Sequence, residues 1–187
     1  MPSAEVVLSL AMARPPTLGA GRLICLDGPA GSGKTTLAGG IASSALAATV
    51  IHMDDLYDGW EGLPHVTDQL DRILRPLAVG VPGGYRRYDW AAGRYAEWVE
   101  VAPTPLLVLE GVGSGSLRHD ALITVLVWVV APPGVRLARG LERDGADAAG
   151  HWRRWMVDEA AHHLQERTEE RADVLVDGTG LTPAVVL

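Results

Sequence analysis

One stretch of this sequence decides the fold, Gly28-Pro29-Ala30-Gly31-Ser32-Gly33-Lys34-Thr35, which matches the pattern G-x-x-x-x-G-K-[ST]. The apolar run at residues 22–27 comes directly before it and is typical of a buried strand. After it, Leu37, Ile41 and Ala45 have the spacing of one face of a helix. A strand, a glycine loop and a helix in this order are the setting in which the pattern binds nucleotide phosphates, and the loop is called a P-loop.

The chemistry of the P-loop predicts its ligands. Its backbone N–H groups and the N-terminus of the following helix both favour an anion. Lys34 can reach the β- and γ-phosphates, and the Thr35 hydroxyl can bind Mg²⁺. We therefore predict ATP and Mg²⁺ as cofactors, with nucleotide contacts from Gly28, Ala30, Gly31, Ser32, Gly33, Lys34, Thr35 and Thr36.

Strand and helix patterns alternate along the rest of the chain. Short apolar runs predict strands at residues 49–53, 106–109, 123–130 and 174–176. Helical spacing predicts helices at residues 4–13, 67–78, 133–143 and 151–171, and a short one at 116–121. Residues 55–65 look irregular, and residues 80–94 look like a loop or hairpin. This order predicts an α/β fold, in which a parallel sheet of about five strands has helices on both faces.

Length and composition limit the class of protein. With 187 residues the chain is expected to form a single domain, residues 1–187, with a small lid at about residues 140–155. No apolar run reaches the ~18 residues of a membrane helix, and the N-terminus lacks the basic segment of a signal peptide. We therefore expect a cytoplasmic protein, and Cys25 as a buried free thiol. The net charge of -7 argues against nucleic acid and anionic membranes as partners, whereas a small-molecule substrate is compatible with it. Oligomerisation is left open.

Carboxylates follow two of the predicted strands. Asp54 and Asp55 end the second strand, and Glu110 ends the third. Ligands of parallel sheets gather at this edge, so we assign Asp54 as the carboxylate that orients an attacking hydroxyl. Glu110 would hold Mg²⁺ through water or touch the acceptor. The alternative for Asp54 is a turn or helix-cap aspartate, and for Glu110 a chance position at a strand end. Asp27, before the P-loop, is either an indirect partner of Mg²⁺ or a polar strand end.

Three classes of P-loop protein compete. A GTPase would need an N-K-x-D segment, and a transport ATPase would need paired Asp-Glu after a strand or an L-S-G-G segment, and this sequence contains none of these. A small-molecule kinase needs the P-loop, an orienting carboxylate and arginines that close over the phosphoryl group. Arg139 and Arg143 lie four residues apart and share a helix face, where they would neutralise that group. The alternative is that this face is solvated.

Several segments together resemble the uridine kinase and phosphoribulokinase branch of P-loop kinases. They occur in the order of that family, at residues 24–36, 50–57, 88–90, 109–111 and 135–144. The resemblance implies transfer of the γ-phosphoryl of ATP to a hydroxyl of a small molecule, with a uridine- or cytidine-type nucleoside as the first choice. It implies catalytic roles for Asp54, Lys34 and Arg143, a nucleotide contact from Arg139, and acceptor contacts from Asp54, Tyr57, Tyr88, Asp89 and Glu110. A sugar, a vitamin precursor or an antibiotic as acceptor, or a nucleotide-binding regulator without turnover, are the alternatives.

The aromatic residues have two interpretations. Tyr85, Tyr88 and Trp90 suit an acceptor pocket, because their rings offer a stacking surface, but they could equally pin a long loop. Trp152 and Trp155 are expected in the core. The pair His162-His163 has no metal-ligand spacing, and we expect one ring to be packed and the other exposed.

Overall fold

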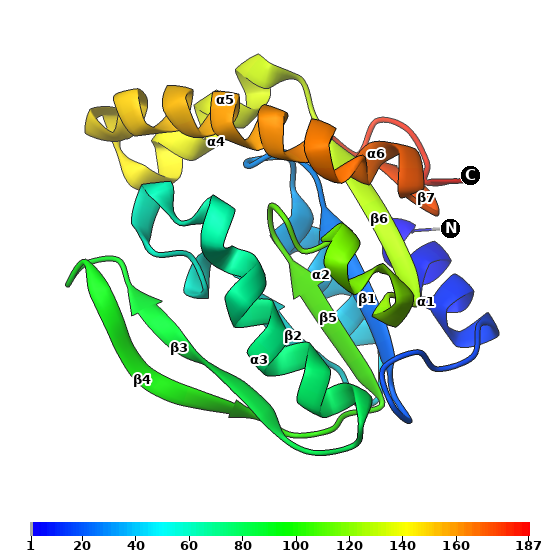
Figure 1. Cartoon of the computed structure of the whole chain (residues 1–187). Coiled ribbons are helices and arrows are strands. Elements are labelled where there is room, and N and C mark those ends of the chain that lie inside the picture. Colours follow the sequence, from blue (N-terminus) through cyan, green and yellow to red (C-terminus); the bar gives the residue numbers. More distant parts are fainter. Residues whose placement is uncertain (1) are drawn as a thin grey trace.

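The computed structural model describes residues 2–187. One sheet has the strand order β2-β5-β1-β6-β7-β8, with helices on both faces (Figure 1). Five strands run parallel: β1 (Arg22–Asp27), β2 (Thr49–His52), β5 (Leu106–Glu110), β6 (Val125–Val130) and β7 (Val174–Asp177). The predicted α/β fold is confirmed. The short β8 (Val185–Val186) pairs antiparallel with β7 and was not predicted, because two residues carry no periodic signal.

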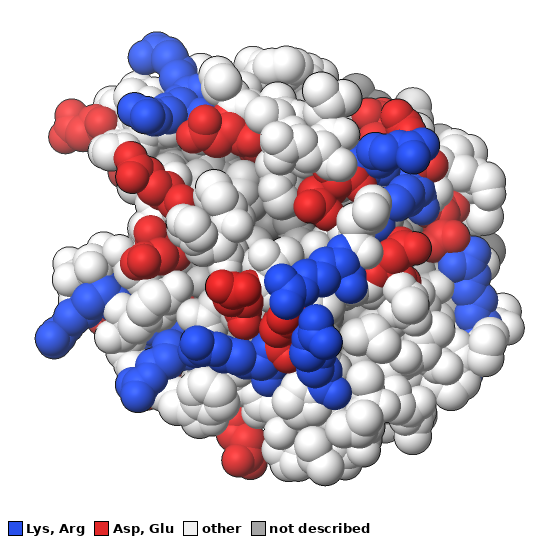
Figure 2. All heavy atoms as spheres, in the orientation of Figure 1, with Lys and Arg blue, Asp and Glu red and all other residues white. Residues whose placement is uncertain are grey.

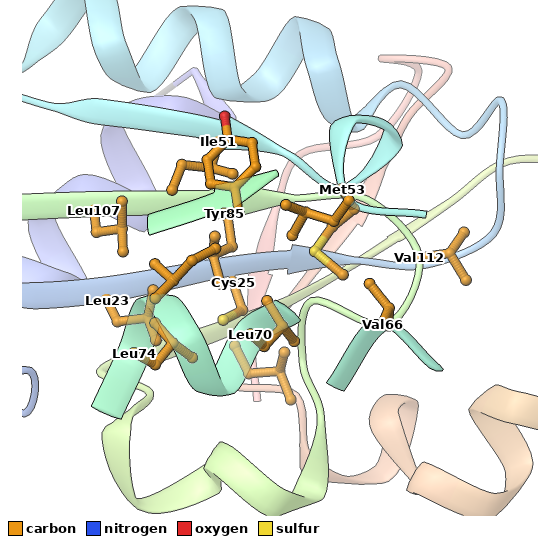
Figure 3. Close-up of a cluster of buried hydrophobic side chains, with 14 of the residues drawn as sticks. Leu23, Cys25, Ile51, Met53, Val66, Leu70, Leu74, Tyr85, Leu107 and Val112 are labelled. Carbon is orange, nitrogen blue, oxygen red and sulfur yellow. The ribbon is translucent and has the colours of Figure 1, made fainter. Parts of the chain in front are cut away.

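Two cores lie on opposite faces of the sheet, because successive side chains of a strand point to opposite sides. Leu23 and Cys25 of β1 pack into one core with residues of α3 (Val66–Ala78) and α5 (Ala149–Glu166). Figure 3 shows Cys25 in this core beside Leu23 and Leu70, as expected for a buried free thiol. Ile24 and Leu26 pack into the other core, under α1 (Ser3–Ala13) and α2 (Lys34–Ser44).

A separate hairpin packs beside α3. It consists of β3 (Gly83–Asp89) and β4 (Arg94–Val101), which run antiparallel (Figure 1). The hairpin alternative for residues 80–94 is therefore correct, although the second strand extends further, to Val101. Tyr85 and Val101 are buried against the core of α3, which attaches the hairpin to the domain.

The residues predicted to form a lid, about 140–155, lie in the end of α4 (Pro133–Asp144), a short turn (Ala146–Ala148) and the start of α5, and their action as a lid stays a prediction. The predicted helix at 151–171 is two helices, α5 and α6 (Thr168–Arg171). They are separated because Arg167 has a left-handed φ of 50°, which ends a helix. Short 3₁₀ turns fill the remaining connections, at Met53–Asp55, Gly59–Glu61, Leu63–His65 and Leu117–Leu122.

The surface carries charges of both signs. Lys and Arg are interspersed with Asp and Glu on the face seen in Figure 2. No helix within residues 2–187 combines the length and the apolar character that a membrane-spanning segment needs.

Candidate functional site

A cavity of about 810 Å³ opens at the carboxyl edge of the parallel strands. It is bounded by the P-loop, the residues that follow β2 and β5, and the helices α4 and α5. Figure 2 shows the molecule hollowed on the left, below the α4–α5 layer that Figure 1 draws at the top. One end of the cavity is lined by Ala30, Gly31, Gly33, Lys34, Thr35 and Thr36, and we call it the nucleotide end after the ligand that the sequence predicts there.

The P-loop backbone is shaped to approach a ligand closely. Gly28 and Gly31 have φ values of 130° and 76°, which side-chain-bearing residues rarely adopt. A Cβ atom at Gly28 would lie 2.2 Å from the Val129 carbonyl oxygen, and one at Gly31 would lie 2.6 Å from that of Arg136. The first N–H groups of α2 have no partner inside the helix, so they are available to an anion. The loop therefore fits the phosphates of a nucleotide. Gly28 and Ser32 are buried and do not line the cavity, so their nucleotide contacts stay a prediction.

Lys34 lies folded over the loop. Its Nζ donates hydrogen bonds to the carbonyl oxygens of Gly28, at 2.6 Å, and Pro29, at 2.9 Å. Burial lowers the pKa of its ammonium group, and the nearby carboxylates of Asp27 and Glu110 oppose this shift. A buried cation that has only carbonyl partners is well placed to exchange them for phosphate oxygens.

Glu110 stands at the end of β5 beside the P-loop. Its Oε1 accepts a hydrogen bond from Thr35 Oγ1 at 3.0 Å and lies 2.5 Å from His52 Nδ1. The Glu110 contact raises the pKa of His52. Residues 2–187 contain no group of three or more His, Cys, Asp or Glu side chains placed to hold a metal. Mg²⁺ commonly uses one or two protein oxygens together with phosphates and water, so Thr35 and Glu110 fit it. Sequence reasoning missed His52.

Asp54 lies in the turn after β2 and lines the cavity. Its Oδ2 is 3.6 Å from Nη1 of Arg143, which crosses the cavity from α4. The surrounding protein disfavours the charged carboxylate and raises the pKa of Asp54, while the charge of Arg143 lowers it. Trp90 Nε1 donates to the Asp54 carbonyl oxygen at 2.8 Å and holds this turn in place. Asp55 lines the cavity as well.

Aromatic rings form the other end of the cavity, which we call the acceptor end after the ligand that the sequence predicts there. Trp60 lies at their centre, with its ring centroid 5.6 Å from that of Trp90, 6.3 Å from Trp152 and 6.1 Å from Trp155. Trp152 and Trp155 are buried as predicted, and their inner edges also line the cavity, together with Tyr57. Sequence reasoning did not single out Trp60, although its place soon after Asp54 in an irregular segment was a usable signal.

Two predicted acceptor residues lie away from the cavity wall. Tyr88 is buried, with its ring against Trp90 at 5.3 Å and Tyr95 at 5.4 Å. Asp89 accepts hydrogen bonds from the backbone of the hairpin turn, at Ala91 and Ala92. Their acceptor contacts stay a prediction, and of this segment only Trp90 is among the lining residues.

The predicted arginines both reach the cavity but at different ends. Arg139 donates to the carbonyl oxygens of Gly31 and Gly178, both at 3.1 Å, and so lies at the nucleotide end. Arg143 lies opposite Asp54 at the acceptor end. The shared helix face therefore points into the cavity.

Two buried carboxylates support the loops from behind. Asp27 accepts hydrogen bonds from the backbone N–H groups of Gly28, Gly113 and Gly115 and lies 3.1 Å from His163 Nε2. Burial raises the pKa of Asp27, but the contacts with His163 and the backbone outweigh it, so the pKa is lowered. Asp27 does not line the cavity and acts as a structural centre.

Glu159 of α5 is the second buried carboxylate. It accepts from the Ala30 N–H at 2.7 Å and from Arg136 Nη1 at 2.7 Å. It thereby ties the P-loop to α4 and α5, a link that sequence reasoning missed. On the same helix His163 is buried as expected, whereas His162 is half-buried and not exposed, because its ring lies against Gly113.

Comparisons with family models and with curated proteins give no match. Solved structures do match. A possible uridine kinase from Bacillus stearothermophilus is 20% identical with a TM-score of 0.65, over 94% of this chain and 97% of the other. A candidate fructose transport system kinase from Silicibacter sp. TM1040 is 21% identical with a TM-score of 0.70, over 94% and 98%. At these identities the likeness shows a shared fold, and it confirms the predicted P-loop α/β fold.

Proposed function

We propose that the chain is an ATP- and Mg²⁺-dependent phosphotransferase that moves the γ-phosphoryl group of ATP to a hydroxyl of a small molecule. The observation that carries the proposal is that one cavity contains both the P-loop lysine, Lys34, and the carboxylate of Asp54, with Arg143 facing Asp54. The two solved structures described above, which share this fold, are named as kinases, and this supports the proposal.

Each residue has a role that follows from its place. Lys34 and the loop N–H groups bind the phosphates, and Thr35 and Glu110 hold Mg²⁺, whose charge offsets that of the phosphates when it is bound. Asp54 accepts a hydrogen bond from the acceptor hydroxyl and orients it. Arg143 stabilises negative charge on the transferred group.

The acceptor end suits a ring-bearing alcohol. Trp60, Trp90 and Tyr57 offer apolar ring faces beside Asp54, so a uridine- or cytidine-type nucleoside is the first choice. A sugar is the second candidate, because one structure of this fold is named as a candidate fructose transport system kinase. A small-molecule substrate of either type is consistent with a cytoplasmic enzyme.

A panel assay tests the proposal. Nucleosides, free sugars and small alcohols are each incubated with the protein and Mg·ATP, and ADP release is measured against reactions without acceptor or without Mg²⁺. We expect ADP release that depends on both, with one class of acceptor preferred. If Mg·ATP binds tightly and no acceptor is phosphorylated, the chain is a nucleotide-binding regulator and the proposal is wrong.

A further inference from the structure

We infer that Asp144 and Trp152 are positioning residues, which hold the guanidinium of Arg143 so that its Nη1 faces Asp54. Neither residue has a role in the reaction under the proposed function, and Trp152 was expected from the sequence only in the core. The inference rests on the proposed function in one respect, since it takes Arg143 to act on the transferred phosphoryl group.

Asp144 holds one edge of the guanidinium. Its Oδ1 accepts from Arg143 Nε at 2.7 Å, and its Oδ2 accepts from Arg143 Nη2 at 3.0 Å. Such a two-bond pair fixes the plane of the guanidinium as well as its distance. The remaining nitrogen, Nη1, is the one directed at Asp54 Oδ2, 3.6 Å away. The donors that stay free therefore point to where an acceptor and a phosphoryl group would meet.

Trp152 in turn holds Asp144. Its Nε1 donates at 2.8 Å to Oδ2 of Asp144, the oxygen that also accepts from Arg143. The Arg143 guanidinium carbon lies 5.7 Å from the Trp152 ring centroid, within the range of a cation–π contact. The Trp152 ring is buried, and it packs directly on Gly140, where a Cβ atom would lie 2.3 Å from the indole. The chain of contacts thus ends on a side chain that cannot move freely.

The position of this one arginine matters because the cavity offers no substitute. Among the lining residues within 2–187, the other cations are Lys34 and Arg139, and both contact P-loop carbonyl oxygens at the nucleotide end. The lid segment 145–150 contains no arginine or lysine. A single guanidinium that must meet the phosphoryl group gains most from being oriented in advance.

An ordinary surface ion pair would behave differently. The Arg143 and Asp144 side chains are 61% and 24% exposed, and exposed pairs contribute little to stability. The Trp152 N–H and the orientation toward Asp54 are what distinguish a positioning role from such a pair. The exposed pair Arg167–Glu170, with Nε 2.8 Å from Oε2, offers a matched control outside the cavity.

The kinetic test compares Asp144→Asn, Trp152→Phe and the control Glu170→Gln with the parent protein. Asn keeps the size of the side chain but accepts only one of the two guanidinium bonds, and Phe keeps a ring without the N–H. We expect Asp144→Asn and Trp152→Phe to lower kcat about tenfold with KM for ATP changed by less than about twofold, as loss of a charge-assisted bond predicts. Glu170→Gln should match the parent protein. An unchanged kcat in Asp144→Asn overturns the inference.

Repeating Asp144→Asn in an Arg143→Ala background separates positioning from structure. If Asp144 acts through Arg143, the second substitution adds less than about twofold to the loss from Arg143→Ala alone. A tenfold loss in both backgrounds would show a role independent of Arg143 and would overturn the inference.

A spectroscopic readout needs no acceptor, so it separates failure of this inference from failure of the proposed function. In ¹⁵N-labelled protein, the Nε–H signal of Arg143 and the indole N–H signal of Trp152 should both shift in Asp144→Asn and stay in place in Glu170→Gln. If the panel assay finds no acceptor but these signals shift, the contacts hold and the kinase proposal fails. If the signals do not move, the inference fails whatever the assay shows.

Discussion

Asp54 is half-exposed at the cavity, and the guanidinium of Arg143, 3.6 Å away, favours the charged form of its carboxylate. Replacing Asp54 with Asn keeps the size of the side chain and one acceptor oxygen but removes the charge. We predict that Asp54→Asn binds Mg·ATP normally and lowers kcat by about 10²–10⁴. Calorimetry measures the binding, and ADP release with the preferred acceptor measures kcat. Near-normal turnover would end the assignment of Asp54.

Lys34 is the only lysine among the 187 residues, so an amine-reactive reagent that modifies a lysine modifies the P-loop. Burial lowers the pKa of Lys34, so more of its amine is neutral and reactive than in an exposed lysine. The same burial leaves the residue only 6% exposed, which limits access of a reagent. We predict that an amine-reactive reagent labels Lys34 slowly in the free protein and that Mg·ATP prevents this labelling.

Peptide mass spectrometry follows the Lys34 label, and the N-terminal amine of the same molecules serves as the internal control. Equal rates of Lys34 labelling with and without Mg·ATP would contradict nucleotide binding at the loop.

At the scale of elements, α5 fixes the P-loop through Glu159. Gln keeps an oxygen for the Ala30 N–H but removes the charge that Arg136 also needs. We predict that Glu159→Gln weakens Mg·ATP binding about tenfold, because a charge-assisted bond that shapes the loop becomes a neutral one. Calorimetry at a temperature where the variant is folded measures this. Asp158→Asn, at the exposed neighbouring position on α5, is the control and should bind as the parent protein does.

The elements themselves were largely predictable from the sequence. Strands of the parallel sheet are buried on both faces, so β1, β5 and β6 read as continuous apolar runs. The strand β4 was missed beyond residue 94 because most of it is not buried and lacks such a run. The break at Arg167 was missed because a left-handed residue other than glycine has no local signal.

The site was predictable only where a local sequence pattern marks its residues. The P-loop is one segment, and Asp54 and Glu110 each end an apolar run, so the pattern identified them. Glu159 is 129 residues from Ala30, and His52 is 58 residues from Glu110. Contacts over such separations follow from helix and strand packing, which a single sequence does not encode locally.

For the molecule as a whole, Asp27 joins the P-loop, the loop after β5 and α5 beneath the cavity. Asp27→Ala leaves buried N–H groups and His163 without their acceptor. We predict that this substitution lowers the free energy of unfolding by about 3–5 kcal/mol. Urea denaturation measures it, and the exposed Asp158→Ala should change the value by less than about 0.5 kcal/mol.

The pH dependence of this effect has a defined sign. The pKa of Asp27 is lowered in the folded protein, so the Asp27 carboxylate stabilises the fold fully at pH values above the pKa of an unfolded aspartate, about 3.9. This stabilisation is lost as the pH falls through the pKa that Asp27 has in the folded protein. The difference in unfolding free energy between the parent protein and Asp27→Ala should therefore narrow in acid, and a difference that widens in acid would contradict the assignment.

Four of the six tryptophans, Trp60, Trp90, Trp152 and Trp155, line a single cavity. Indole fluorescence responds to the water and charges around the ring, so most of this protein's natural emission originates where a substrate would enter. Compound collections can consequently be screened by intrinsic fluorescence, without a dye or a coupled assay, before any acceptor is known.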